Sequence, residues 1–243
     1  MLQYETIVPR VYVESTVVSY LAARPSNNPK SASRQRTTQR LWQNYADRFE
    51  FVISPVVRDE IERGDARAAQ QRLEIISPFT VLEILPEARV LVQKLLDAGA
   101  VPLNSAPDAQ HIAIATAHSV DYLVSWNHKH IVNEHKREHI NEVCIEAGFI
   151  PTTLCTPSEL MEEIQMKESP EKHPEFDPET YTDPILEECY RIKAEISAQF
   201  KTVEEYYLYL KAKEEKEKRN GVKYVSYFDP SKHKTPETSK DND

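Results

Sequence analysis

Three acidic side chains stand where the sequence pattern places strand ends and helix starts. Glu14 ends the strand-like run VYVE, Glu60 opens a helix after the run FVISP, and Asp108 opens another helix-patterned segment. Binding sites in open α/β sheets collect at the carboxyl ends of the strands, so these acids can meet in one cleft. Hard divalent cations prefer oxygen ligands. The sequence therefore predicts a Mg²⁺ or Mn²⁺ site that activates water and neutralises a phosphodiester.

A structural interpretation competes with this one, because acidic residues also cap helix N-termini and interact with the helix dipole. From spacing alone the structural interpretation is the stronger. His111 shares the helical face of Asp108 and either contacts substrate or packs in the core. The pair His135 and His139 has the spacing of a zinc-binding helix, but no Glu follows the first His, which favours a polar helix face.

The order of elements predicts an α/β protein. Up to about residue 165, short β-rich apolar runs alternate with helix-patterned segments, as in strands joined by helical crossovers in a parallel sheet. Residues 166–182 are rich in Pro, Glu and Lys and predict a linker. Residues 183–228 predict two amphipathic helices followed by a β-prone segment that could join a sheet edge. Residues 229–243 are predicted to be disordered.

Composition limits the possible partners. The 243 residues include 30 Lys and Arg against 39 Asp and Glu, a formal net charge of −9. This excess of acid argues against broad attraction to phosphate backbones, but a carboxylate metal site contributes to the same excess, so a nucleic-acid substrate is not excluded. Three cysteines without CxxC spacing, no signal peptide and no run of 18 apolar residues predict a cytoplasmic protein with reduced thiols and no membrane contact.

Four segments between residues 9 and 163 resemble a PIN domain, most of all the VapC-like ribonuclease toxins of bacterial type II toxin–antitoxin pairs: VYVESTVVSYL, VVRDEIERGD, PDAQHIAIATAHSVDYLVSWNHKHIVN and GFIPTTLCTPSELM. The resemblance implies a PIN-like fold, with a central parallel sheet flanked by helices. It also implies metal-assisted cleavage of single-stranded or structured RNA, including transfer RNA. In that mechanism Glu14 and Asp108 would be the principal metal ligands, and Glu60 a ligand or a base that orients water.

The fourth acidic position of the family departs from its pattern. Where the family has T-x-D, this chain reads SWN, so Asn127 would complete the catalytic set with an amide and Ser125 would support it. An amide adds no negative charge, so metal affinity should fall, and Asn127→Asp should tighten Mn²⁺ binding. Lys129 and His130 belong to a local basic patch and are candidate RNA contacts, although a solvated surface explains the patch nearly as well.

The segment from residue 183 to residue 226 resembles, more weakly, the short antitoxins that begin with DPI and carry a helix pair. This likeness predicts a toxin and its neutraliser in one chain. The tail would place a cationic side chain among the three carboxylates and so compete with the metal. Arg219 and Lys223, in a basic run near the end of the second tail helix, are the candidate inhibitory residues. The antitoxin-like tail could act on its own chain or in trans.

A different class of function is also open. The chain could be a non-catalytic PIN scaffold that binds RNA or protein, with its tail as a dimerisation element, and a homodimer is predicted in either case. Position 127 separates the two classes, because an amide weakens the metal site and the measured Mn²⁺ affinity would show by how much.

Overall fold

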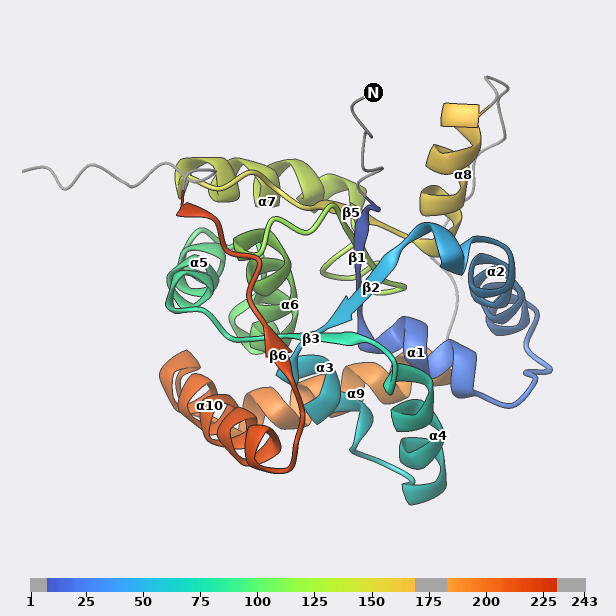
Figure 1. Cartoon of the computed structure of the whole chain (residues 1–243), viewed down its shortest axis with the longest axis horizontal. Helices are drawn as coiled ribbons and strands as arrows, with labels where there is room; N and C mark the ends of the chain where they lie inside the picture. The colour runs from blue at the N-terminus through green and yellow to red at the C-terminus, as the bar shows by residue number, and fades with distance from the viewer. Residues whose placement is uncertain (1–7, 169–182, 231–243) are drawn as a thin grey trace, which may run out of the picture.

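A parallel β-sheet of six strands forms the centre of the computed structural model, which describes residues 8–168 and 183–230 (Figure 1). Every strand pair is parallel, and the strand order is β5-β4-β1-β2-β3-β6. The strands are β1 (Arg10–Val13), β2 (Glu50–Ile53), β3 (Thr80–Leu82), β4 (Tyr122–Val124), β5 (Thr153–Cys155) and β6 (Tyr224–Val225). Helices flank this sheet, which confirms the predicted α/β fold class.

Strand β1 lies where the order of the sheet reverses. It pairs with β2 on one side and with β4 on the other, so Tyr12 is in register with both Val52 and Leu123. In open parallel sheets the crevice beyond the carboxyl ends of the strands at such a reversal is the usual binding position. The residues that follow β1 and β4, from Glu14 and from Ser125, are therefore placed side by side at this crevice.

The body has eight helices, and the tail has two. Those of the body are α1 (Ser15–Ala22), α2 (Pro29–Tyr45), α3 (Pro55–Ile61), α4 (Ala66–Ile76), α5 (Pro86–Asp97), α6 (Ala106–Ala117), α7 (Glu134–Glu146) and α8 (Pro157–Glu168), and those of the tail are α9 (Pro184–Gln199) and α10 (Val203–Arg219). Short 3-10 helices, η1 (Ala46–Arg48) and η2 (Leu103–Ser105), precede β2 and α6. These numbers refer to the described residues.

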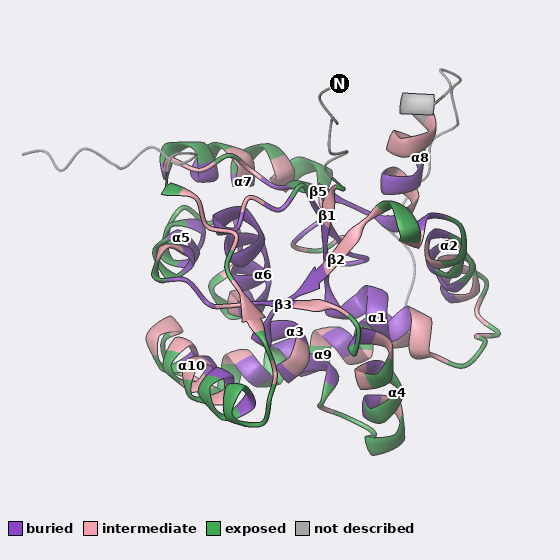
Figure 2. Ribbon diagram, in the orientation of Figure 1, coloured by how far each residue is buried: buried purple, intermediate pink, exposed green. Residues whose placement is uncertain are grey.

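Helix α6 has a central place in the packing. All residues from Pro107 to Ala117 are buried, and Figure 2 shows this helix coloured as buried along its length. A helix that is covered on all sides needs small and apolar side chains, which explains its run of alanines and isoleucines. Because α6 is buried on all sides, Asp108 lies in the interior of the protein.

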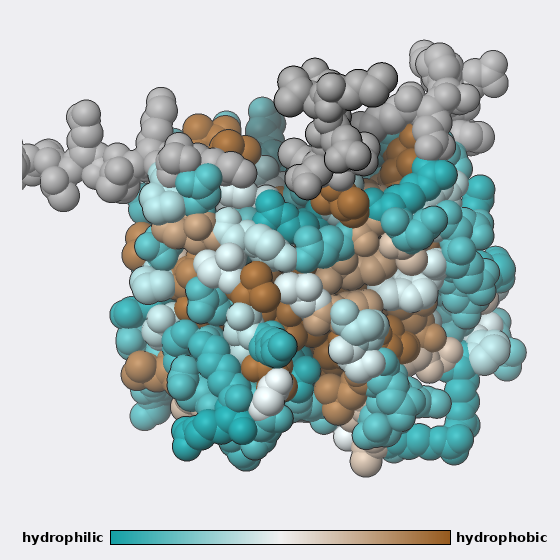
Figure 3. Space-filling view, in the orientation of Figure 1, coloured by the Kyte–Doolittle hydropathy of each residue, from teal (hydrophilic) through white to brown (hydrophobic). Residues whose placement is uncertain are grey.

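The tail is part of the hydrophobic core and is not an appendage. Helix α9 packs on α1, α3 and α6, and α10 packs on α3 and α5. Ile196, Tyr206 and Leu210 are buried in the same core cluster as the strands. Strand β6 pairs with β3, which confirms that the segment after α10 adds a strand to the sheet edge. Figure 3 shows hydrophilic side chains over the outer face of the region that α10 occupies in Figure 1.

The structure describes two of the boundaries predicted around the tail, the end of the body and the start of α9. Asp183 caps α9, and its side chain accepts hydrogen bonds from the backbone N–H groups of Ile185 and Leu186. Helix α8 continues past residue 165 to Glu168, into the predicted linker. The rest of that linker, residues 169–182, and residues 231–243 of the predicted disordered tail lie outside the described residues. Within the described part of the chain, no helix is long and apolar enough to cross a membrane.

Candidate active site

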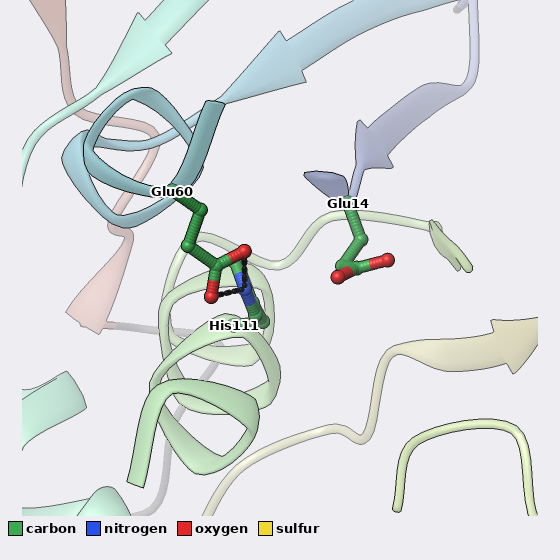
Figure 4. Close-up of side chains that lie close together, drawn as sticks. All are labelled: Glu14, Glu60 and His111. Carbon is green, nitrogen blue, oxygen red and sulfur yellow. Dashed lines mark hydrogen bonds and ion pairs between the residues drawn. The ribbon is translucent and has the colours of Figure 1, made fainter. Parts of the chain in front are cut away.

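The three predicted carboxylates meet at the crevice beyond β1. Glu14, Glu60 and Asp108 are all buried, with at most 3% of each residue exposed. Figure 4 shows Glu14 at the end of β1 facing Glu60, which projects from α3 beside His111. Asp108 enters from the first turn of α6. Residues that are far apart in the sequence are therefore brought together by the parallel order of the strands.

The structure defines the local role of two of these acids, Glu14 and Glu60. Glu14 is the N-cap of α1, because its carboxylate accepts a hydrogen bond from the backbone N–H of Thr16. The capping interpretation is therefore correct for this residue and coexists with a place in the cluster. The expectation that Glu60 opens a helix is wrong. Ser54 caps α3 and Pro55 starts it, so Glu60 lies in its last turn.

The ammonium group of Lys193, on tail helix α9, occupies the centre of the carboxylate cluster. Its Nζ lies 3.0 Å from Glu14 Oε1, 2.8 Å from Glu60 Oε1 and 3.1 Å from Asp108 Oδ1, and only 4% of its side chain is exposed. An ammonium has three N–H donors, so it can serve each carboxylate. Three buried carboxylates without a counter-ion would be costly, and Lys193 supplies the compensating charge.

The pKa values follow from this geometry. Burial alone raises the pKa of Asp108, but Lys193, followed by a hydrogen bond from His130, outweighs it and lowers the pKa to about 2. The pKa of Glu14 is lowered for a similar reason, with Lys193 the largest influence that opposes burial. Burial lowers the pKa of Lys193, yet its carboxylate neighbours, Glu60 first, raise it well above the usual value. Glu14 and Asp108 are therefore carboxylates, and Lys193 is an ammonium, at neutral pH.

The expected position of Arg219 or Lys223 among the carboxylates is wrong, since the described structure places Lys193 there instead. Arg219 and Lys223 are both exposed. The guanidinium Nε of Arg219 donates to the carbonyl of Glu215 in its own helix. The pairing of β6 with β3 explains the error, because it holds the end of α10 near the edge of the sheet, away from the order reversal at β1.

The sequence did contain a signal for Lys193. Leu186, Cys189 and Ile196 form the buried stripe of α9, and Lys193 lies four residues after Cys189 and three before Ile196. At helical spacing this places the lysine on the apolar face. A lysine there has to be paired inside the protein, and the acidic cluster is the place where it is paired.

Asn127 and Ser125 lie at the site, where they orient the carboxylates. The amide Nδ2 of Asn127 donates to Asp108 Oδ1 at 3.0 Å, and Ser125 Oγ donates to Glu14 Oε2 at 2.8 Å. The amide oxygen of Asn127 accepts backbone N–H bonds from Lys129 and His130. In this conformation Asn127 holds both Asp108 and the loop after β4.

We expect Asn127→Asp to destabilise the metal-free protein. The change replaces an N–H donor with a carboxylate oxygen that faces Asp108, so a buried hydrogen bond becomes a repulsive contact. The expected loss is about 1–3 kcal/mol in the free energy of unfolding, measured by urea denaturation in EDTA. Asn133→Asp is the matched control, because Asn133 only caps α7 and aspartate caps helices equally well. Equal stability of the two variants would show that Asn127 does not contact Asp108.

His111 is a member of the site whose role the sequence left open. Its Nε2 lies 3.2 Å from both carboxylate oxygens of Glu60 and 3.1 Å from Lys193 Nζ, and its Nδ1 lies 2.9 Å from the hydroxyl of Tyr12. Within residues 8–168 and 183–230, Glu14, Glu60 and His111 form the group whose potential metal-ligand atoms all lie within 4.8 Å of one another. The fully buried His111 therefore packs within the cluster and orients Glu60.

Residues of the basic patch contact other residues of the same chain. His130 Nδ1 lies 2.8 Å from Asp108 Oδ2, which places this histidine in the site itself. The ammonium of Lys129 lies over the ring of Tyr190 on α9, 5.7 Å from its centre. Arg137 forms a bidentate pair with Glu159. RNA contact by Lys129 and His130 stays a prediction.

No protein-family model matches the chain, and no curated protein matches its sequence. Among solved structures, the crystal structure of VapBC2 from Rickettsia felis bound to a DNA fragment from their promoter is similar, with 15% sequence identity and a TM-score of 0.39. The match covers 60% of this chain and 98% of the matched chain. The chemistry assigned below therefore rests on the side chains of this protein.

Proposed function

We propose that the chain is a Mg²⁺- or Mn²⁺-dependent endoribonuclease of the PIN toxin type, held inactive by its own antitoxin-like tail. The observation that carries this proposal is the position of Lys193 Nζ, between 2.8 and 3.1 Å from the three carboxylates. A body that gathers three buried carboxylates at a sheet crevice has a cation site. A tail that places an ammonium there blocks it.

The side chains present fit a hard divalent cation. Among the described residues, Glu14 and Glu60 supply carboxylate oxygens and His111 a ring nitrogen within 4.8 Å of one another, with no cysteine thiol in this group. Asp108 adds a further carboxylate oxygen, 3.1 Å from the ammonium of Lys193. A bound divalent cation would supply positive charge to the reacting phosphate and lower the pKa of water. Glu14 and Asp108 would hold it, Glu60 beside His111 would hold it or accept a proton from water, and Ser125 and Asn127 would keep the carboxylates in place.

Metal and Lys193 exclude each other, because both need the same three carboxylates. The tail belongs to the same chain, so the ammonium is present at a high effective concentration and a modest intrinsic affinity is enough to keep the site closed. Activity then requires α9 to move away, or Lys193 to be replaced. RNA is the substrate that the PIN resemblance favours, and neutralisation by the tail is the antitoxin-like role.

Lys193→Gln is the test. We expect the full-length variant to cleave a pool of cellular RNA in Mn²⁺ at least about tenfold faster than the parent, because an equilibrium shift of only about 1.4 kcal/mol toward the open site gives that factor. Lys213→Gln is the matched control, since Lys213 also pairs with two carboxylates of the body, Asp59 and Glu62, but outside the cluster.

A second control addresses the residues first chosen from the sequence. Arg219→Ala combined with Lys223→Ala should leave the cleavage rate of the full chain unchanged, since both side chains are exposed and away from the carboxylates. If Lys193→Gln cuts no RNA in either Mg²⁺ or Mn²⁺, the nuclease proposal is wrong, and the non-catalytic scaffold becomes the better explanation.

A further inference from the structure

A second charged contact joins the tail to the body, at the N-terminus of α9. Asp183 is 4% exposed, and its Oδ2 accepts a hydrogen bond from Arg34 Nη1 at 3.0 Å and one from the hydroxyl of Tyr20. Arg34 belongs to α2 and Tyr20 to α1, so both donors come from the body. The body thus presents a built site for an anion, and the tail supplies the anion.

The donors of this site are held by the body itself. The guanidinium of Arg34 lies 5.4 Å from the ring centre of Trp126, and the ring of Tyr20 meets the same indole edge to face at 5.9 Å. Trp126 is fixed in turn, because its Nε1 donates to the hydroxyl of Thr38 at 2.8 Å. None of these supports is on α9, so the arrangement of donors would persist when α9 leaves.

The contacts of α9 follow one order along the body. Asp183 binds Arg34 and Tyr20, Tyr190 lies over Lys129, and Lys193 binds the carboxylates. At 1.5 Å per helical residue, Asp183 and Lys193 are separated by about 15 Å along the axis of α9. The helix therefore presents a negative group to the basic end and a positive group to the acidic end of one surface.

We infer that Arg34 and Tyr20 form a phosphate-binding subsite for single-stranded RNA, which Asp183 occupies when the tail is closed. This inference rests on the nuclease function proposed above. A strand whose reacting phosphate lies at the carboxylates together with a divalent cation presents the same order of charges as α9, with a further phosphate a few nucleotides away at Arg34. The planar guanidinium suits phosphate and carboxylate alike, and a tyrosine hydroxyl is a common phosphate donor.

The rival explanation is that Arg34 only anchors the tail, and the two partners of the ion pair separate these explanations. If Arg34 only anchors, Asp183→Asn and Arg34→Gln break the same contact, and both should open the site and improve RNA binding. If Arg34 also binds phosphate, the two changes have opposite effects. Asp183→Asn frees the subsite, whereas Arg34→Gln removes it. Asparagine also caps helices well, so Asp183→Asn should leave the start of α9 intact.

The experiment uses the full-length chain carrying Lys193→Gln, with a fluorescent single-stranded RNA whose binding is followed by anisotropy in Ca²⁺. We expect Asp183→Asn to lower Kd and Arg34→Gln to raise it about tenfold, the usual effect of a lost hydrogen bond to a charged group. Arg34→Gln should also reduce the slope of log Kd against log salt by about 0.7, as expected for one lost phosphate contact on a single strand. Arg191→Gln is the control for net charge, because Arg191 is exposed on α9 and pairs with Glu195.

Cleavage in Mn²⁺, measured in parallel, separates failure of this inference from failure of the nuclease proposal. Opposite shifts in Kd without cleavage would support the subsite and overturn the nuclease. Cleavage with shifts in the same direction would overturn the subsite alone. If none of the variants binds RNA, the subsite inference is also overturned. Arg34→Lys, which keeps the charge, should restore part of the affinity, and circular dichroism of each variant verifies its fold.

Discussion

Replacing Lys193 with methionine should make the folding stability of the full-length chain depend on Mn²⁺. Methionine keeps most of the volume but leaves Glu14, Glu60 and Asp108 buried together without their counter-ion. Removal of one partner from a buried ionic group typically costs about 3–5 kcal/mol. A divalent cation that binds only the folded variant restores about 2.7 kcal/mol at a hundred times its Kd. Urea unfolding in EDTA and in Mn²⁺ measures both effects.

The parent chain and a matched variant sharpen this test. In the parent, Lys193 already occupies the centre of the cluster, so Mn²⁺ should change its stability little. In Lys213→Met, buried Asp59 keeps its ion pair with Arg63 and its hydrogen bond from Tyr209, and Glu62 is partly exposed, so we expect a smaller loss and no response to Mn²⁺. If Lys193→Met is as stable as the parent in EDTA, the ammonium does not hold the cluster together, and the proposed inhibition has no structural basis.

The sequence was sufficient to predict the α/β sheet, because alternating strand and helix segments give a parallel sheet. A parallel sheet gathers the ends of its strands at one edge, which accounts for the position of Glu14. The spacing alone did not place Glu60, which lies in the last turn of α3. The structure brings Glu14, Glu60 and Asp108 together around a single point, the ammonium of Lys193.

Charge density alone could not predict which tail residue contacts the carboxylates. Arg219 and Lys223 belong to a conspicuous basic run, whereas Lys193 is a single lysine in a mixed helix. What decides between them is the docking of α9 on α1, α3 and α6, which is a tertiary property. The orientation of the Asn127 amide has the same origin. The loop after β4 places the N–H groups of Lys129 and His130 around its oxygen, and no local pattern records that.

Asp108→Asn should abolish RNA cleavage in the Lys193→Gln chain and should also destabilise the otherwise unaltered protein. A cluster of carboxylates viewed alone suggests the opposite for stability, since removal of one charge relieves repulsion. In the structure, however, Asp108 accepts from His130 at 2.8 Å and lies 3.1 Å from Lys193 Nζ. The attraction of Asp108 to Lys193 and His130 therefore outweighs its repulsion from Glu14 and Glu60. With its pKa lowered to about 2, the ionised Asp108 contributes roughly 2 kcal/mol at neutral pH.

The pH dependence of this contribution has a definite sign. Because the pKa of Asp108 is lower in the folded chain, its stabilisation is fully present above about pH 4, where the unfolded carboxyl is ionised, and is lost as the pH falls through about 2. The difference in unfolding free energy between the parent and Asp108→Asn should therefore shrink over that range. Asp97→Asn, at an exposed position on α5, should show no such difference.

The background in which Asp108→Asn is measured should reverse its effect on stability. In the Lys193→Met chain the attraction from the ammonium is gone, and Asp108 faces Glu14 and Glu60 while it keeps the hydrogen bonds from His130 and Asn127. There the same substitution should stabilise the metal-free protein, and it should remove the response to Mn²⁺ because a ligand is lost. Urea unfolding of the four chains forms a double-mutant cycle. Additive effects in that cycle would show that Lys193 and Asp108 do not interact, and would contradict the closed site described by this structure.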